Sequence, residues 1–180
     1  MDASAAPAAR LGHDLATAAL VLAVAVDPFT GLRRRAGFAE LVVHQQRADA
    51  VMRRAGPVPS VASAVAGLGA SAVVVRREPA EAALRSASVL AVAAAVVLTV
   101  RVHVPINEQL RTWSPEVEVP GWRETWGAWE RAHVARRALT ALAGTLVVAA
   151  AAVPTGGGRR GSPWAARQQQ PRRTASTASA

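Results

Sequence analysis

The sequence contains no cysteine, no lysine and no tyrosine, and it has only two phenylalanines. Without cysteine the chain cannot form a disulfide, an iron–sulfur cluster or a thiolate metal site. The 21 basic residues are all arginine, and this bias, together with the abundant alanine, reflects a GC-rich coding genome rather than a function. Because large side chains are scarce, alanine and valine supply most of the 51% of residues that are hydrophobic.

The sequence also has no glycine-rich loop of the kind that binds phosphate, and no Ser–His–Asp set can be picked out. The net charge of +9 and the isoelectric point near 11.8 invite a nucleic-acid interpretation. However, the arginines are dispersed at the ends of apolar segments instead of lining one face. Arginines beside a membrane span can extend to the lipid phosphates. We therefore expect membrane lipid as a partner and no nucleic acid.

Four apolar segments divide the chain, at residues 11–26, 58–75, 87–100 and 138–153. The last three are apolar on all sides, whereas a soluble helix keeps a charged face toward water. We expect an all-α, four-helix transmembrane bundle, with clear spans near 58–75, 86–104 and 132–153. A soluble, alanine-rich bundle is the alternative.

The N-terminal region is expected to pack as the fourth helix, with an interruption at residues 27–36, after about ten disordered residues. Small residues at Ala62, Ala66 and Ala70 are expected to let a neighbouring helix approach closely. Gly56 to Pro59 is expected to be a break, and Pro105 to end the third span. The domain prediction is a helical bundle over residues 1–155 and a disordered tail rich in Arg, Ser and Gln over 156–180.

The most informative stretch lies in and before the last helix, which we expect to begin near Gly121 as an interfacial, Trp-rich extension of the last span. At 100° per residue, five side chains fall within a stripe roughly 80° wide. They are Trp122, Trp126, Trp129, His133 and Arg136. Tryptophans are common at a membrane boundary, but ionisable groups on the inner face of a span are costly and usually functional. Trp113 and Trp164, in the predicted loop and tail, receive no role.

Four side chains are possible metal ligands, but their spacing does not favour a metal site. Glu40, His44, His103 and His133 each lie near the end of an apolar segment, but no two histidines are three or four residues apart, and we expect no metal. Glu40 and His44 lie on one face of a helix expected over residues 38–54. Glu40 and His44 could form an exposed pair on this helix or take part in a pocket, and both interpretations stay open.

Residues 104–137 contain an ordered set of motifs. Pro105-Ile106-Asn107 is followed by Trp113, Ser114-Pro115 and Trp122-Arg123, and then by Trp129-Glu130-Arg131 with His133 and Arg136. This order resembles the anthrone-oxygenase-like family of small four-helix membrane proteins, many of which are catalogued only as a domain of unknown function. The resemblance covers residues 37–153, and Gly37 to His44 resemble the end of that family's first helix.

The resemblance implies an integral protein of the bacterial cytoplasmic membrane that oxidises an anthrone, or a related polycyclic aromatic polyketide, with dioxygen and without a cofactor. This chemistry needs a base, a partner for an oxyanion and an apolar slot. His133 is the expected base, because an unperturbed imidazole pKa near 6.5 suits that task. Arg136 would hold the developing negative charge, and Asn107 would bind the same oxygen.

The expected substrate-binding residues complete this assignment: Trp129 stacks on the ring system, Trp122 lines the mouth, and Glu40 and His44 form a wall. Two alternatives remain open. The chain could be a non-catalytic membrane protein in which Asn107, His133 and Arg136 form a structural network, or a small transporter or assembly factor.

Overall fold

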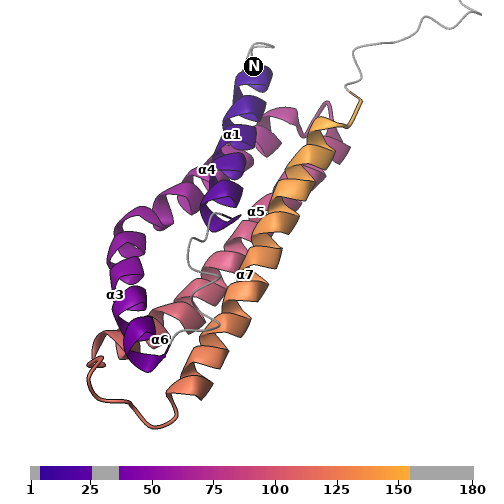
Figure 1. Ribbon diagram of the computed structural model, residues 1–180. Coiled ribbons are helices and arrows are strands. Elements are labelled where there is room, and N and C mark those ends of the chain that lie inside the picture. The colour runs from indigo at the N-terminus through magenta and orange to yellow at the C-terminus, as the bar shows by residue number, and fades with distance from the viewer. Residues whose placement is uncertain (1–4, 26–36, 155–180) are drawn as a thin grey trace, which may run out of the picture.

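The computed structural model describes residues 5–25 and 37–154, and within these ranges all regular secondary structure is helical (Figure 1). The expected all-α architecture is therefore confirmed. The elements are α1 (Ala5–Ala25), α3 (Phe38–Ala55), α4 (Pro57–Val74), α5 (Pro79–Leu98), a π-helical turn η1 (Thr99–His103), α6 (Val104–Arg111) and α7 (Trp122–Ala151). The predicted interruption at 27–36 and the predicted tail from Gly156 onward lie outside the described residues.

Four helical stretches are long and apolar enough to cross a membrane, as expected of an integral membrane protein. They are Ala5–Ala25, Phe38–Val74, Pro79–Arg111 and Trp122–Ala151. α4 packs between α1 and α5, while α7 packs on α5 and also contacts α1, which closes a four-helix arrangement. The prediction of ten disordered N-terminal residues is wrong, since α1 is already helical from Ala5.

The predicted break at Gly56 to Pro59 is confirmed as the junction between α3 and α4, whereas the predicted stop at Pro105 is absent. Gly56 keeps a right-handed helical conformation between α3 and α4, and Pro57 occupies the first turn of α4, where no backbone N–H is needed. Pro105 likewise lies in the first turn of α6. The five residues before α6 widen into the π-helical turn η1, so the helical stretch that begins with α5 continues past Pro105 as far as Arg111 instead of ending there.

α7 begins where the sequence predicts. Gly121 has a φ of +75°, which only glycine adopts readily, and the helix follows directly from Trp122. A polar loop of ten residues, 112–121, connects α6 to α7.

The interface of α4 lies one residue away from the predicted stripe of Ala62, Ala66 and Ala70. Its buried positions include Ser63, Gly67, Ala70 and Ser71, whereas Ala62 is exposed. The Thr17 and Ser63 hydroxyls are 2.8 Å apart inside the bundle. The predicted use of small residues therefore holds, but with glycine and serine at the contact.

Gly67 provides a direct test of this packing. A Cβ atom built on Gly67 would lie 2.5 Å from Val89 Cγ2 and 2.8 Å from His13 Nε2. Gly67→Ala is therefore expected to lower the free energy of unfolding by about 1–3 kcal/mol. The matched control is Gly69→Ala, because a Cβ there meets nothing within 4 Å and alanine favours a helix by up to about 1 kcal/mol. Thermal unfolding in detergent measures both variants, and equal effects would contradict the packing.

Candidate active site

The first half of α7 buries the predicted stripe against the rest of the protein. The rings of Trp126 and Trp129 are parallel within 9°, with centroids 4.9 Å apart, and those of Trp129 and His133 within 11° at 5.0 Å. Trp126 comes one turn before Trp129 and His133 one turn after it, so the three rings form one continuous stack along the helix. Both faces of Trp129 are thereby covered, and this arrangement leaves none for stacking on a substrate.

His133 and Arg136 contact each other on this buried side. His133 Nδ1 lies 3.1 Å from Arg136 Nη2. Since a guanidinium can only donate, Nδ1 accepts, and a neutral His133 carries its proton on Nε2. His133 is buried and Arg136 is half-buried. The contact therefore joins a potential base to a permanent positive charge inside the protein.

Asn107 connects three helices. Its Oδ1 accepts hydrogen bonds from Trp129 Nε1 at 2.9 Å and from Gln45 Nε2 at 3.3 Å. Its Nδ2 donates to Asp49 Oδ1 at 3.0 Å. Both acceptor positions of the amide oxygen are thus used, and Asn107 joins α3 and α7 through α6. Gln45 and Asp49 were not predicted as site residues. Their spacing of four residues on an amphipathic helix puts both polar side chains on one face and could have indicated them.

Replacing Asn107 should therefore affect stability. Asn107→Ala leaves Trp129 Nε1, Gln45 Nε2 and Asp49 without these bonds, at an expected cost of about 1–3 kcal/mol in the free energy of unfolding. The neighbouring, exposed Gln109 is the matched control, and Gln109→Ala should change this free energy by less than about 0.5 kcal/mol. Denaturant titration followed by helical circular dichroism would measure both, and a neutral Asn107→Ala would exclude the bridging role.

His103 belongs to the same cluster. It ends the η1 turn, is only 2% exposed, and meets the ring of Trp129 edge-on at 5.0 Å and that of His133 at 6.3 Å. From the sequence, His103 was a candidate only for metal binding. Among the described residues, no group of three or more His, Cys, Asp or Glu side chains could hold a metal ion.

The remaining predicted site residues come from the start of α7 and from the first half of α3. Trp122 precedes His133 by eleven residues, or about 16 Å of helix, and its ring meets Phe38 at 5.6 Å in an aromatic core. Glu40 is exposed in the first turn of α3, and His44 is half-buried one turn later. Trp113, which received no role, is buried in the core with Phe38, and its carbonyl accepts a hydrogen bond from Gln46.

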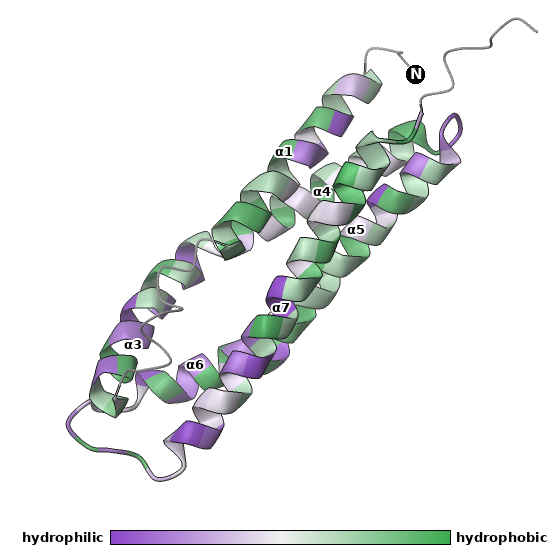
Figure 2. Cartoon of the chain, turned by 45° about the vertical axis from the view of Figure 1, so that its right-hand side comes forward, coloured by the Kyte–Doolittle hydropathy of each residue, from purple (hydrophilic) through white to green (hydrophobic). Residues whose placement is uncertain are grey.

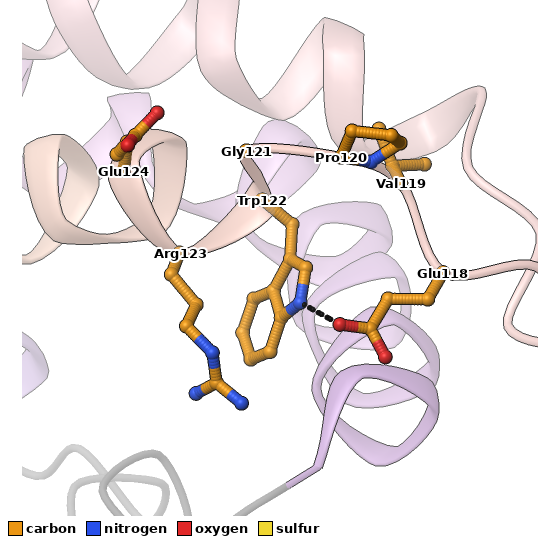
Figure 3. A pocket seen from close by; sticks show the side chains of 7 residues that line it. All are labelled: Glu118, Val119, Pro120, Gly121, Trp122, Arg123 and Glu124. Atoms are coloured by element: carbon orange, nitrogen blue, oxygen red, sulfur yellow. Dashed lines mark hydrogen bonds between the residues drawn. The ribbon is translucent and has the colours of Figure 1, made fainter.

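An open hollow of about 510 Å³ lies beside Trp122 (Figure 3). One short segment, residues 118–124, lines it. Trp122 Nε1 donates to the Glu118 carboxylate at 2.7 Å, and the guanidinium of Arg123 lies 4.3 Å from the centre of the Trp122 ring. This hollow is at the tip of the molecule and is separate from the His133–Arg136 contact.

A second ionic cluster, which sequence analysis missed, lies near the opposite end of the bundle. Arg85 is 1% exposed, and it donates to Glu81 at 2.8 Å, to Asp14 at 2.7 Å and to His13 Nδ1 at 3.1 Å. Arg10 donates to Glu81 as well, at 2.6 to 3.1 Å. The cluster joins α1 to α5 across 71 or 72 residues of sequence, so local patterns could not indicate it.

Comparison with known proteins supports the expected family. The family model described as anthrone oxygenase matches residues 50–147, which is more than half of the chain. No curated protein and no solved structure matches the chain. The matched region includes Asn107, Trp129, His133 and Arg136, and it excludes Glu40 and His44. On this match, and with four helices able to span a membrane, the chain belongs to the anthrone oxygenase family.

Proposed function

We propose that this protein is a cofactor-independent oxygenase of the bacterial cytoplasmic membrane that acts on an anthrone-like or related polycyclic aromatic polyketide. The observation that supports this best is the buried contact between His133 and Arg136, within the part of the chain that the family model matches. A base beside a fixed positive charge, in surroundings of low dielectric constant, is suited to forming an aromatic enolate.

In the first step, the carbonyl oxygen of the anthrone takes the guanidinium of Arg136 away from His133. The lone pair of Nδ1, which accepts from Arg136 in the free protein, then becomes available. It removes one proton from the CH₂ group between the two aryl rings, and the electron pair of that C–H bond enters the ring system. The negative charge collects on the oxygen beside Arg136, where the guanidinium stabilises it.

In the second step, the electron-rich anion transfers one electron to dioxygen, and the resulting radical pair joins to form a C–O bond. The imidazolium of His133 protonates the outer oxygen, which gives a hydroperoxide. Removal of the remaining proton from the same carbon breaks the O–O bond and forms the new C=O bond, and water leaves. One anthrone and one dioxygen yield one anthraquinone and one water, so no other oxidant is needed.

The surrounding residues position this pair. Trp129 stacks on His133 and holds Asn107 with its indole N–H, so it orients the base and does not contact the substrate ring. Asn107 and Trp129 therefore act by positioning the His133–Arg136 pair. Glu40, His44 and Trp122 stay outside the chemical step.

A direct assay tests the proposal. The purified protein in detergent is mixed with an anthrone in air-saturated buffer, and quinone absorbance is followed against anoxic buffer and heat-denatured protein. Quinone formation should exceed the spontaneous rate only with folded protein and dioxygen. If folded and denatured protein give the same rate, the oxygenase proposal for this substrate class fails.

One observation favours a second candidate, a non-catalytic membrane protein. Asn107 uses both acceptor positions to join α3, α6 and α7, which is what a structural network requires. The two candidates differ in what substitution of His133 changes, because a structural histidine affects stability and a base affects turnover.

A further inference from the structure

The molecule has a more apolar half, with most of α4, α5 and the C-terminal part of α7, and a more polar half, with α3 and the first turns of α7 (Figure 2). Large apolar side chains are exposed on α1, α4, α5 and the C-terminal half of α7; examples are Leu15, Leu22, Val65, Leu68, Leu90, Val97 and Val148. In contrast, α3 and the first turns of α7 expose charged groups, including Arg47, Arg54, Glu124 and Arg131. We call α3, α6, the loop after α6 and the first turns of α7 the head.

The lengths of the helices show that a bilayer cannot cover both halves. α5 has 20 residues and is therefore about 30 Å long, equal to the hydrocarbon thickness of a membrane. α7 has 30 residues, or about 45 Å, and fitting it into 30 Å would need a tilt of about 48°, beyond the usual range of about 0–40°. At least part of the head must therefore extend beyond the hydrocarbon layer.

The contacts of Asn107 fix the level at which the two halves meet. Asn107 bonds to Trp129 on α7 and to Asp49 on α3, so these three residues lie at one height. On the side of the apolar half, Arg131 lies two residues after Trp129 and Arg53 lies four residues after Asp49. On the same side, Arg101 lies six residues before Asn107. At 1.5 Å per residue these arginines lie within about 10 Å of one another along the bundle.

Five arginines near this junction form what we call the arginine girdle: Arg53, Arg54, Arg101, Arg131 and Arg137. Four of them are exposed, and Arg137 is half-buried. They come from α3, η1 and α7 and so surround the molecule on several sides. In the described part of the chain, three acidic residues lie near this level, Asp49, Glu108 and Glu130, and two of them pair with arginines: Asp49 with Arg53 at 3.1 Å and Glu108 with Arg111 at 3.5 Å. The other acidic residues of the head are nearer its tip: Glu40, Glu116, Glu118 and Glu124.

We propose that the arginine girdle binds the phosphate groups of anionic phospholipids, while the rest of the head stands in water. A guanidinium can bind a phosphate through two parallel hydrogen bonds. The girdle lies at the edge of the apolar half, which is where the headgroups of one leaflet would be. The arginines outnumber the acidic residues at this level, and four further acidic residues lie nearer the tip, so the girdle presents a net positive charge to these headgroups. This inference does not depend on the proposed enzymatic function.

The test compares two triple variants of the full-length protein in vesicles. The girdle variant carries Arg54→Gln, Arg101→Gln and Arg131→Gln. The control carries Arg47→Gln, Arg111→Gln and Arg123→Gln, which removes the same charge from exposed arginines of the head on the tip side of Asn107. Each protein is reconstituted into phosphatidylcholine with increasing phosphatidylglycerol, and retained lipids are counted by native mass spectrometry. Each arginine near a membrane surface contributes about fivefold to anionic lipid binding.

The wild-type protein should retain phosphatidylglycerol in preference to phosphatidylcholine, and the girdle variant should lose at least about tenfold of that preference. The control variant should lose less than about threefold. If the triple girdle variant does not fold, the single substitutions Arg54→Gln and Arg101→Gln should each lower the preference about fivefold. Equal losses in girdle and control variants, or no preference in the wild-type protein, would overturn the proposal.

Discussion

Arg85→Met is expected to lower the free energy of unfolding by about 1–3 kcal/mol, because it removes the bonds that the buried Arg85 makes to Glu81, Asp14 and His13. Arg85 is the only residue that bonds Glu81, Asp14 and His13 together in the described part of the chain. Glu81 would keep Arg10, but the Asp14 and His13 bonds would be lost. Thermal unfolding in detergent, followed by helical circular dichroism, measures the loss.

Two further variants separate this explanation from a general effect of removing charge. Arg76→Met removes an exposed arginine near the same end of the bundle and should change the free energy of unfolding by less than about 0.5 kcal/mol. The triple variant Arg10→Met/Glu81→Met/Arg85→Met removes Glu81 together with both of its arginine partners and should recover part of the loss, since apolar replacements of buried ion networks are often neutral. A triple variant less stable than Arg85→Met would contradict this explanation.

The second large effect concerns turnover. If His133 is the base, His133→Gln should reduce the rate of quinone formation about 100- to 10,000-fold. Arg136→Lys should also be impaired, because an ammonium group cannot reproduce the planar guanidinium at the His133 contact. Its matched control is Arg137→Lys, since Arg137 is the adjacent half-buried arginine and lies outside the site. This control should keep the wild-type rate.

Stability must be measured on the same proteins. Loss of turnover with an unfolding temperature close to that of the wild type would support catalysis by His133. Loss of about 1–3 kcal/mol of stability with turnover retained would favour the structural network.

The sequence predicted well those features that depend on local spacing. The apolar segments predicted membrane-spanning helices because they lack a charged face, and helical periodicity placed Trp129, His133 and Arg136 on one side of α7. It could not predict contacts between distant segments. Arg85 looked like the end of an apolar run, and only the packing of α1 against α5 shows it bonded to Asp14.

At Pro105 and Trp129 the structure differs from the prediction for local reasons that a sequence pattern does not specify. Pro105 was expected to end a helix, but the η1 turn removes the need for its backbone N–H and places His103 against Trp129. Trp129 was expected to stack on a substrate, but the χ angles of Trp126 and His133, which periodicity does not determine, let their rings cover both of its faces.

We propose above all that His133 starts the oxidation of an aromatic substrate by dioxygen, by removing a proton from that substrate. The most direct measurement is the initial rate of quinone formation under ¹⁸O₂ for wild-type and His133→Gln proteins at equal folded concentration. The account predicts that the wild-type product carries one ¹⁸O atom in its new carbonyl group, and that His133→Gln forms this product only at the spontaneous rate. Equal rates of labelled quinone formation by the two proteins would contradict it.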